Sequence, residues 1–269
     1  MKPRKRRPSL LVAVLPVYNE EKTLSEILER VSKVADRVIL VNDGSRDSTG
    51  RILDRFVRAR RGAYRVTLPL NRGMAAALAA GFRFALHLRD LGEIQDQDVV
   101  ATLDADGQHR PEYLPEGKKR LLTGKLDVLL TSRDFSAYPL YKVLGNWFLT
   151  RTNRVLSGFP YDDVESGMRF LRVSALEPIL RYYTGFKYSC AQEIALLSAR
   201  QGLRVANDFQ VEIDYYRPGT TVMDGFVVLA YSLAAFFRWK LGQPITPPMD
   251  QPLMEESYRE SRRLWPRRP

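Results

Sequence analysis

Short apolar runs alternate with amphipathic segments along the first part of the chain. The apolar runs, which predict strands, are 10–15, 38–41 and 99–103, and 64–68 is a further, shorter predicted strand. The segments between them carry apolar residues every three or four positions, which indicates helices with one buried face. Thr23 is the expected N-cap of the first helix, and Asp47 or Ser48 that of the second. Continuous apolar strands that alternate with helices predict a doubly wound, mostly parallel α/β sheet.

The second part of the chain continues this pattern and then changes. Its predicted strands are 128–132 and 169–173, with one or two more within 205–216, and its predicted helices are 140–157 and 189–200. The segment 222–241 is almost wholly apolar up to Arg238-Trp239-Lys240. It is too apolar for an exposed helix, so it either docks on the core or lies in a membrane interface. No run of roughly 18 apolar residues occurs, so we expect no membrane-spanning helix.

These patterns divide the chain into four parts. We expect a basic flexible arm at 1–8, a folded α/β domain at 9–220, the apolar helix at 221–242 and a flexible tail rich in proline and arginine at 243–269.

The formal net charge of +11 indicates an anionic partner, such as nucleic acid, a phosphorylated substrate or an anionic membrane. Part of this charge lies in the two basic ends of the chain, for which membrane contact is an alternative to simple solvation. The single cysteine, Cys190, excludes an internal disulfide and is compatible with a reducing compartment. With only two histidines besides, the chain lacks the ligands of a conventional zinc site.

Two carboxylates follow the predicted strand 99–103, at Asp104 and Asp106, and Gln108 comes two residues later. Alternate residues of an extended chain point to opposite sides, so the chain must turn at Ala105 and Gly107 for both carboxylates to reach one ion. Carboxylate and amide oxygens suit Mg²⁺ or Mn²⁺, which usually also hold substrate phosphates. The alternative is a solvated strand end or an Asx turn.

Polar loops also follow the strands 10–15 and 38–41, at 16–21 and 42–49, and Arg133 follows the strand 128–132. Ligands of open α/β sheets bind beyond the carboxyl ends of the strands, so these loops are expected to converge on the Asp104 loop. The chain has neither a Walker-type phosphate loop nor a dinucleotide fingerprint, which argues against NAD binding and ATP hydrolysis.

Six motifs, taken in order and in this strand context, resemble the family 2 glycosyltransferases with the GT-A fold, in particular the dolichyl- and polyprenyl-phosphate mannosyl- or glucosyltransferases. They are Leu15-Pro16-Val17-Tyr18-Asn19-Glu20-Glu21, Val41-Asn42-Asp43-Gly44-Ser45-Arg46-Asp47-Ser48-Thr49, Asp104-Ala105-Asp106-Gly107-Gln108-His109-Arg110-Pro111, Thr131-Ser132-Arg133, Asp163-Val164-Glu165-Ser166-Gly167-Met168-Arg169 and Arg217-Pro218-Gly219-Thr220-Thr221. The resemblance covers about residues 10–240. It implies a GT-A catalytic domain at 9–220.

The resemblance further implies an inverting, metal-dependent enzyme that moves a hexose from a nucleotide sugar, of the GDP-mannose or UDP-glucose type, to a polyprenyl or dolichyl phosphate. The implied nucleotide-binding residues are Pro16, Tyr18, Glu20, Asp43, Asp104 and Ala105. The implied ligands of Mg²⁺ or Mn²⁺ are Asp104, Asp106 and Gln108, and the implied catalytic residues are Asp104, Asp106, Arg133 and Arg217. Further candidates for binding the acceptor or its phosphate are Arg72, Ser136, Lys142, Asp163, Arg169 and Glu193.

Two departures from the family pattern affect the acceptor. Met74 stands where the family often has a lysine, so Arg72 is a candidate for that charge. Many relatives carry carboxy-terminal membrane spans, which are not expected here. The resemblance then implies a peripheral enzyme at the cytoplasmic face of an anionic membrane, alone or with a membrane partner subunit.

The main alternative is a soluble family 2 enzyme that glycosylates a hydroxyl group of a polysaccharide or small molecule. Such an acceptor would need a carboxylate base, for which Glu193 and Asp163 are the candidates, whereas a lipid phosphate is already anionic. A nucleotidyltransferase would share the sheet and the metal site. Nucleic-acid binding fits the charge but not the carboxylates at strand ends, which would repel phosphate without a metal.

Overall fold

The computed structural model describes residues 7–136, 138–213, 222–245 and 251–266. Its centre is a seven-stranded sheet with the order β3-β2-β1-β4-β6-β5-β7. The strands are β1 (Leu11–Val17), β2 (Arg37–Asn42), β3 (Ala63–Thr67), β4 (Val99–Thr102), β5 (Val128–Arg133), β6 (Arg169–Arg172) and β7 (Val205–Val211). All neighbours pair in parallel except β6, which is antiparallel to both β4 and β5.

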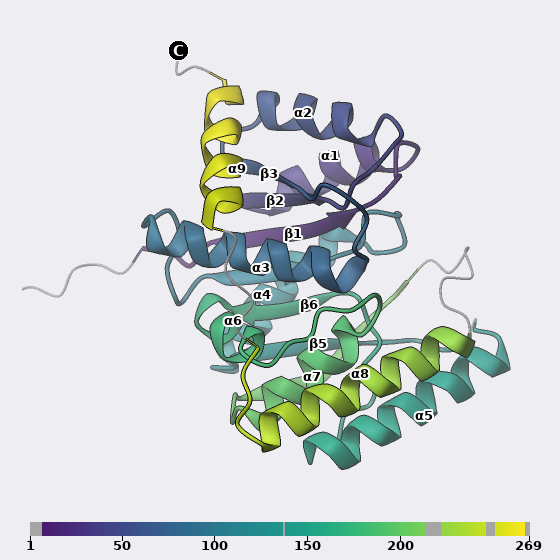
Figure 1. Cartoon of the computed structure of the whole chain (residues 1–269). Helices are drawn as coiled ribbons and strands as arrows, with labels where there is room; N and C mark the ends of the chain where they lie inside the picture. The colour runs from purple at the N-terminus through teal and green to yellow at the C-terminus, as the bar shows by residue number, and fades with distance from the viewer. Residues whose placement is uncertain (1–6, 137, 214–221, 246–250, 267–269) are drawn as a thin grey trace, which may run out of the picture.

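Helices cover both faces of the sheet (Figure 1). They are α1 (Leu24–Val34), α2 (Thr49–Ala59), α3 (Met74–Asp90), α4 (Leu114–Thr123), α5 (Leu140–Ser157), α6 (Val173–Leu180), α7 (Cys190–Arg200), α8 (Val222–Lys240) and α9 (Gln251–Leu264), with a short 3₁₀ helix at Pro111–Tyr113. The predicted doubly wound, mostly parallel α/β sheet is therefore confirmed. The helices α4 and α6 were not predicted from the sequence.

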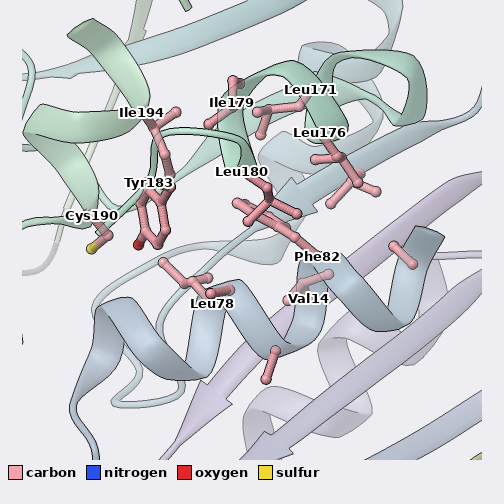
Figure 2. Close-up of a cluster of buried hydrophobic side chains, with 14 of the residues drawn as sticks. Val14, Leu78, Phe82, Leu171, Leu176, Ile179, Leu180, Tyr183, Cys190 and Ile194 are labelled. Atoms are coloured by element: carbon pink, nitrogen blue, oxygen red, sulfur yellow. The ribbon is translucent and has the colours of Figure 1, made fainter. Parts of the chain in front are cut away.

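The side chains of β1 point alternately into two separate cores. Val12 and Val14 point into the core under α3, α6 and α7, while Leu11, Ala13 and Leu15 point into the core under α1, α2 and α4. Figure 2 shows the first core, where Phe82 of α3 lies between Val14 and the α6 residue Leu180. Gly81 permits this close approach, because a Cβ there would lie 2.5 Å from Cγ1 of Val14.

The predicted flexible tail at 243–269 is wrong for residues 251–264, which form α9. This helix lies along β3, the edge strand, and next to α2 (Figure 1). Trp265 Nε1 donates to the carbonyl of Ala63 at 2.7 Å, and the backbone N–H of Arg65 donates to Ser261 Oγ at 3.0 Å. These side chains satisfy outward backbone groups that an edge strand otherwise leaves to solvent. The predicted arm is also anchored at its end, since Arg7 pairs with the buried Asp98 at 2.6 Å.

Of the two alternatives left open for α8, the structure shows docking on the protein by one face, and the membrane interface stays a prediction. Val228, Ser232 and Ala235 are buried, and the helix contacts α5 and α7, so one face docks on the protein. Its opposite face, with Met223 and Phe226, is exposed. None of the helices within the described residues is long and apolar enough to cross a membrane.

Candidate active site

Strand direction gathers the candidate residues at one edge of the sheet. The parallel strands β1, β2, β4 and β5 end there, so the segments that follow them lie side by side. Because β6 runs the other way, the segment that precedes it, 163–168, also reaches this edge. The register of β4 and β6 brings the segment 163–168 to the loop after β4, since Thr102 at the end of β4 pairs with Arg169 at the start of β6.

The loop after β4 turns so that the carboxylates of Asp104 and Asp106 lie close enough to interact. Gly107 has φ of 89°, a conformation that favours glycine. Asp106 accepts the backbone N–H of Gln108 at 3.0 Å and the side-chain amide N–H of Gln108 at 2.7 Å. The amide oxygen of Gln108 therefore remains as a further acceptor beside the two carboxylates.

The electrostatics of this loop favour a bound cation. Burial, and then the neighbouring Asp104 carboxylate, raise the pKa of Asp106. Within the described part of the chain, neither carboxylate pairs with a lysine or arginine. His109 lies beside Asp104, with Nδ1 3.3 Å from Oδ2. No group of three or more His, Cys, Asp or Glu side chains arranged for a metal occurs among these residues. Two carboxylates and one amide oxygen nevertheless fit Mg²⁺ or Mn²⁺, which commonly takes its other ligands from water and substrate phosphates.

His109, which was not among the predicted site residues, holds Asp104 in place. The backbone N–H of Asp104 donates to His109 Nδ1 at 3.0 Å, and the histidine is buried. Gly167 packs against both, since a Cβ there would lie 2.3 Å from His109 Cε1 and 2.6 Å from Asp104 Oδ2. The signal for His109 was its place in the 104–111 motif, but its partner is a backbone group that only the fold brings within reach.

The loop after β1 is hydrogen-bonded to the loops after β2 and β4. Asn19, with φ of 53°, donates its N–H to Ser45 Oγ at 3.1 Å and so joins the loop after β1 to the loop after β2. Thr23 was expected to cap α1 with its side chain, but it makes no such bond. Its hydroxyl instead lies 3.0 Å from Glu20 Oε2 and 3.1 Å from the carbonyl of Ala105, which links the first loop to the carboxylate loop.

The remaining predicted nucleotide-binding residues line this edge. Pro16 pairs with Val41 at the end of β1, and the Tyr18 ring is exposed just beyond it.

At the start of α2, Ser48 occupies the N-cap without a side-chain bond, and Asp47 accepts the N–H of Thr49 at 2.9 Å. Of the two predicted caps, Asp47 therefore supplies the interaction.

Asp43 is buried and holds the loop that follows β3. Its two oxygens accept the backbone N–H groups of Arg72 and Gly73, each at 2.8 Å, and burial raises its pKa. Gly44 must be glycine here, because a Cβ would lie 2.6 Å from the backbone carbon of Leu70. The Arg72 side chain is exposed, while Met74 packs against the core. Arg72 therefore remains available for an anion at the rim.

Arg133 lies at the same edge but is engaged by Asp163. Nε and NH2 of Arg133 donate to the two Asp163 oxygens at 2.8 and 3.0 Å, and NH2 also donates to Asn146 Oδ1 at 3.0 Å. The rings of Phe135 and Tyr138 lie 5.0 and 5.7 Å from the guanidinium carbon. Asp163, as the partner of a buried cation, is poorly suited to act as a free general base.

Glu193 is buried and holds a loop through hydrogen bonds. It accepts the N–H and hydroxyl of Thr184 at 2.5 and 2.6 Å, and the hydroxyl of Ser189. Burial raises its pKa to about 7. The loop 184–189 in turn rests on α3, since the N–H of Ala75 donates to the carbonyl of Lys187 at 2.7 Å. Glu193 therefore holds this loop in position.

The other predicted acceptor residues are more scattered. Ser136 is exposed, and its N–H donates to Asp134 at 2.9 Å. Lys142 of α5 is half-buried, and burial followed by the charge of Arg133 lowers its pKa. Arg169 is buried and donates to the carbonyl of Gly167 at 3.3 Å. Arg217 lies outside the described residues.

The chain is similar to known proteins along most of its length. Over 241 residues the chain is 25% identical to a UDP-N-acetylglucosamine–dolichyl-phosphate N-acetylglucosaminyltransferase of Methanococcus voltae, covering 81% of this chain and 93% of that one. It is 26% identical to an undecaprenyl-phosphate mannosyltransferase of Micrococcus luteus, covering 86% and 94%. Glucosyl-3-phosphoglycerate synthase of Mycobacterium tuberculosis, solved with UDP, has a similar fold, with a TM-score of 0.61, 20% identity and coverage of 85% and 80%.

One family model covers the loops after β1, β2, β4 and β5. The model of glycosyl transferase family 2 matches residues 12–180, which include the loops after all four strands and the segment before β6. The chain therefore belongs to glycosyl transferase family 2 and is a glycosyltransferase.

Proposed function

We propose that this glycosyltransferase is an inverting, metal-dependent enzyme that moves a hexose from a nucleotide sugar to a polyprenyl phosphate at a membrane surface. The observation that carries the proposal is the pair Asp104 and Asp106, which lies at the strand ends without a lysine or arginine partner in the described part of the chain. An uncompensated pair of this kind suits a divalent ion and the diphosphate that it binds.

In the proposed reaction, an acceptor oxygen attacks the anomeric carbon of the sugar from the face opposite the nucleotide. The bond from that carbon to the diphosphate oxygen breaks, and the nucleoside diphosphate leaves with the electron pair. Mg²⁺ or Mn²⁺, held by Asp104, Asp106 and the Gln108 oxygen, would offset the charge gathered on the leaving group. Crystal structures of the Mycobacterium tuberculosis synthase contain Mn²⁺ with UDP-glucose, which supports a divalent ion here.

Two observations favour a phosphate as the acceptor. The relatives from Methanococcus voltae and Micrococcus luteus are named for dolichyl phosphate and undecaprenyl phosphate. Within this chain, the two candidate bases for a hydroxyl acceptor are both engaged, Asp163 by Arg133 and Glu193 by Thr184 and Ser189. A phosphate oxygen is already anionic at neutral pH, so positioning and charge stabilisation suffice without a base.

The test is transfer of labelled sugar from UDP-glucose, GDP-mannose and UDP-N-acetylglucosamine to undecaprenyl phosphate in detergent. We expect label in the lipid extract with one donor, dependent on Mn²⁺ or Mg²⁺ and abolished by EDTA. A parallel reaction offers a small phosphorylated acid, because the structural neighbour was solved with phosphoglyceric acid. Label that enters only the water-soluble acceptor would overturn the lipid assignment and favour a soluble acceptor.

A further inference from the structure

The segment that precedes β6 contacts both Arg133 and Asp104. At its start, Asp163 Oδ2 accepts a hydrogen bond from Arg133 Nε at 2.8 Å. At its end, Gly167 packs on Asp104, because a Cβ at Gly167 would lie 2.6 Å from Asp104 Oδ2. Glu165 comes midway between these two contacts, two residues from each. The segment therefore carries a third carboxylate between the metal loop and the Arg133 side of the site.

The Glu165 side chain uses one of its two oxygens within the described part of the chain. Oε1 accepts a hydrogen bond from Gln192 Nε2 at 2.6 Å. Oε2 accepts no hydrogen bond from the described residues, and the residue is half-buried rather than sealed in the core. A carboxylate oxygen with no protein donor can accept a hydrogen bond from a ligand.

Buried side chains hold Glu165 in position from below. Its backbone N–H donates to Asp163 Oδ1 at 2.9 Å. Its partner Gln192 belongs to α7, which lies beside α5 (Figure 1). The Asn153 side chain of α5 donates to the carbonyl and the side-chain oxygen of Gln192, at 2.9 and 2.8 Å, and both residues are buried. A side chain supported in this way keeps one position, as a residue that selects a substrate must.

The negative charge of Glu165 is not required by its contact with Gln192. A glutamine at this position would offer the same acceptor oxygen to Gln192 Nε2. Burial raises the pKa of Glu165, so its ionised form is costly, although the hydrogen bond from Gln192 and the charge of Arg133 oppose this effect. A carboxylate kept where its fold partner does not need a charge indicates a ligand that donates a hydrogen bond.

The place of Glu165 corresponds to the place of the sugar in the proposed reaction. The diphosphate of the donor would lie at the Asp104 loop, with the divalent ion, and the acceptor phosphate on the Arg133 side. Because the acceptor attacks from the face opposite the nucleotide, the sugar ring lies between the two. It would therefore lie next to the segment that contacts both, and its hydroxyl groups are hydrogen-bond donors.

We propose that Glu165 is a specificity-determining residue, whose Oε2 accepts a hydrogen bond from one hydroxyl group of the transferred sugar. A site that binds a hydroxyl group discriminates strongly against a sugar that lacks it. The inference rests on the proposed function as far as the donor is a nucleotide sugar, and it does not depend on a lipid as the acceptor.

The test is calorimetric titration of the full chain with Mn²⁺ and a nucleoside diphosphate, compared with the matching nucleotide sugar. The pairs are UDP with UDP-glucose, UDP with UDP-N-acetylglucosamine and GDP with GDP-mannose. The variants are Glu165→Gln and Glu165→Ala. The matched control is Asp162→Asn, because Asp162 is an exposed acid of the same region that pairs with Arg154 at 3.3 Å. Thermal melting of every variant checks folding.

We expect all variants to bind the free diphosphate within about twofold of the wild type. The Glu165 variants should bind the nucleotide sugar roughly tenfold or more weakly, and their kcat/KM for transfer should fall at least as far. The control should match the wild type in both. Glu165 variants that keep the affinity for the nucleotide sugar would overturn the proposal. This includes variants that lose only kcat with a hydroxyl acceptor, because Glu165 would then act as a base.

Donors that each lack one sugar hydroxyl identify the contact. At one position, loss of the hydroxyl should cost the wild type about tenfold in affinity and the Glu165→Gln variant less than about threefold, since both changes remove one interaction. Additive losses at every position would overturn the proposal. A wild type that binds every deoxy donor as well as the parent would also overturn it, and this measurement needs no variant.

Failure of this inference and failure of the proposed function give different results. If sugar is transferred but the Glu165 variants keep the affinity that the sugar adds, the function stands and the contact falls. If label enters only a water-soluble acceptor, the acceptor assignment falls and the contact stands. If no nucleotide sugar binds with Mn²⁺ or Mg²⁺, the proposed function falls and the contact falls with it.

Discussion

The two ends of the sheet are built in opposite ways. Under the proposed function, β1, β2 and β3 with α1, α2 and α9 form the donor end, and β5 and β7 with α5, α7 and α8 form the acceptor end. At the donor end, apolar side chains face inward and polar side chains join neighbouring loops. At the acceptor end, small and polar residues are buried in α5 while large apolar ones face outward. The two ends therefore differ in where their large apolar side chains lie, buried at the donor end and exposed on α5 at the acceptor end.

This difference matches the two substrates of the proposed reaction. A nucleotide sugar arrives from water and needs polar loops held in fixed positions, which the donor end supplies. A lipid phosphate arrives from a bilayer and needs an enzyme surface that tolerates apolar contact beside a cation. If the comparison is right, changes at the donor end should affect chemistry or folding, whereas changes on the outer face of the acceptor end should affect membrane contact alone.

The largest effect is expected from Asp106→Ala. Loss of one carboxylate removes charge that would hold the metal and diphosphate, so the transfer rate should fall by about a thousandfold or more. Binding of Mn²⁺ with UDP or GDP, measured by calorimetry, should weaken in parallel, while the melting temperature should be kept. Asp134→Ala is the matched control, because Asp134 is an exposed acid near the same edge. Near-normal turnover of the Asp106 variant would contradict the metal assignment.

The next effect concerns the buried pair at the acceptor end. Asp163→Ala leaves Arg133 without its partner, and breaking a buried pair from one side should lower the free energy of unfolding by about 3–5 kcal/mol. Asp162→Ala is the neighbouring control, since Asp162 is exposed and pairs with Arg154 at 3.3 Å. Its cost should stay below about 1 kcal/mol. Equal urea midpoints for the two variants would show that Arg133 finds another anion.

The third prediction is a pH dependence set by Glu193. Burial raises its pKa from 4.5 to about 7, so the folded state favours the protonated carboxyl. Its contribution to stability is therefore complete below pH 4.5 and is lost as the pH rises through about 7. Glu193→Gln should remove this decline, which amounts to roughly 3 kcal/mol.

Urea unfolding at pH 5 and pH 8 measures this prediction. Glu177→Gln is the control, because Glu177 is an exposed acid on α6. The wild type and the control should lose stability between the two pH values, and the Glu193 variant should lose less. An unchanged pH dependence in the Glu193 variant would mean that the carboxyl is already ionised in the folded protein.

The sequence predicted the burial of the donor-end strands better than the burial of side chains on α5, for a physical reason. A continuous apolar run such as 38–41 has one stable place, inside a covered sheet, so its pattern determines both the element and its burial. The apolar stripe of α5 predicts a helix equally well, but it does not say that Thr150 and Asn153 face inward. For Asn153 the inward position depends on Gln192, which is distant in sequence and accepts its hydrogen bonds.

The missed features share this dependence on distant partners. The helix α9 buries Ser257 and Ser261, so its apolar period is weak, and its place against β3 depends on bonds to Ala63 and Arg65. Thr23 was predicted as a cap because local rules are all that a sequence offers, whereas its partner Ala105 belongs to another strand end. The carboxylates of the Asp104 loop were predictable because the residue types that suit a metal lie within a few positions of one another.

The smallest expected effect comes from replacing one tryptophan at each end by phenylalanine. Because the same substitution is made at both ends, it compares them directly. Trp265→Phe keeps a ring against Tyr64 but removes the N–H that donates to Ala63, so the free energy of unfolding should fall by about 1 kcal/mol. Trp147→Phe on the exposed face of α5 should leave the free energy of unfolding unchanged. The same Trp147 variant should weaken vesicle flotation slightly, since phenylalanine retains most of the apolar area but loses the amphipathic ring that suits the interface. A Trp147 variant that unfolds more easily while floating normally would place α5 among the elements that stabilise the fold, and the contrast between the two ends would not hold.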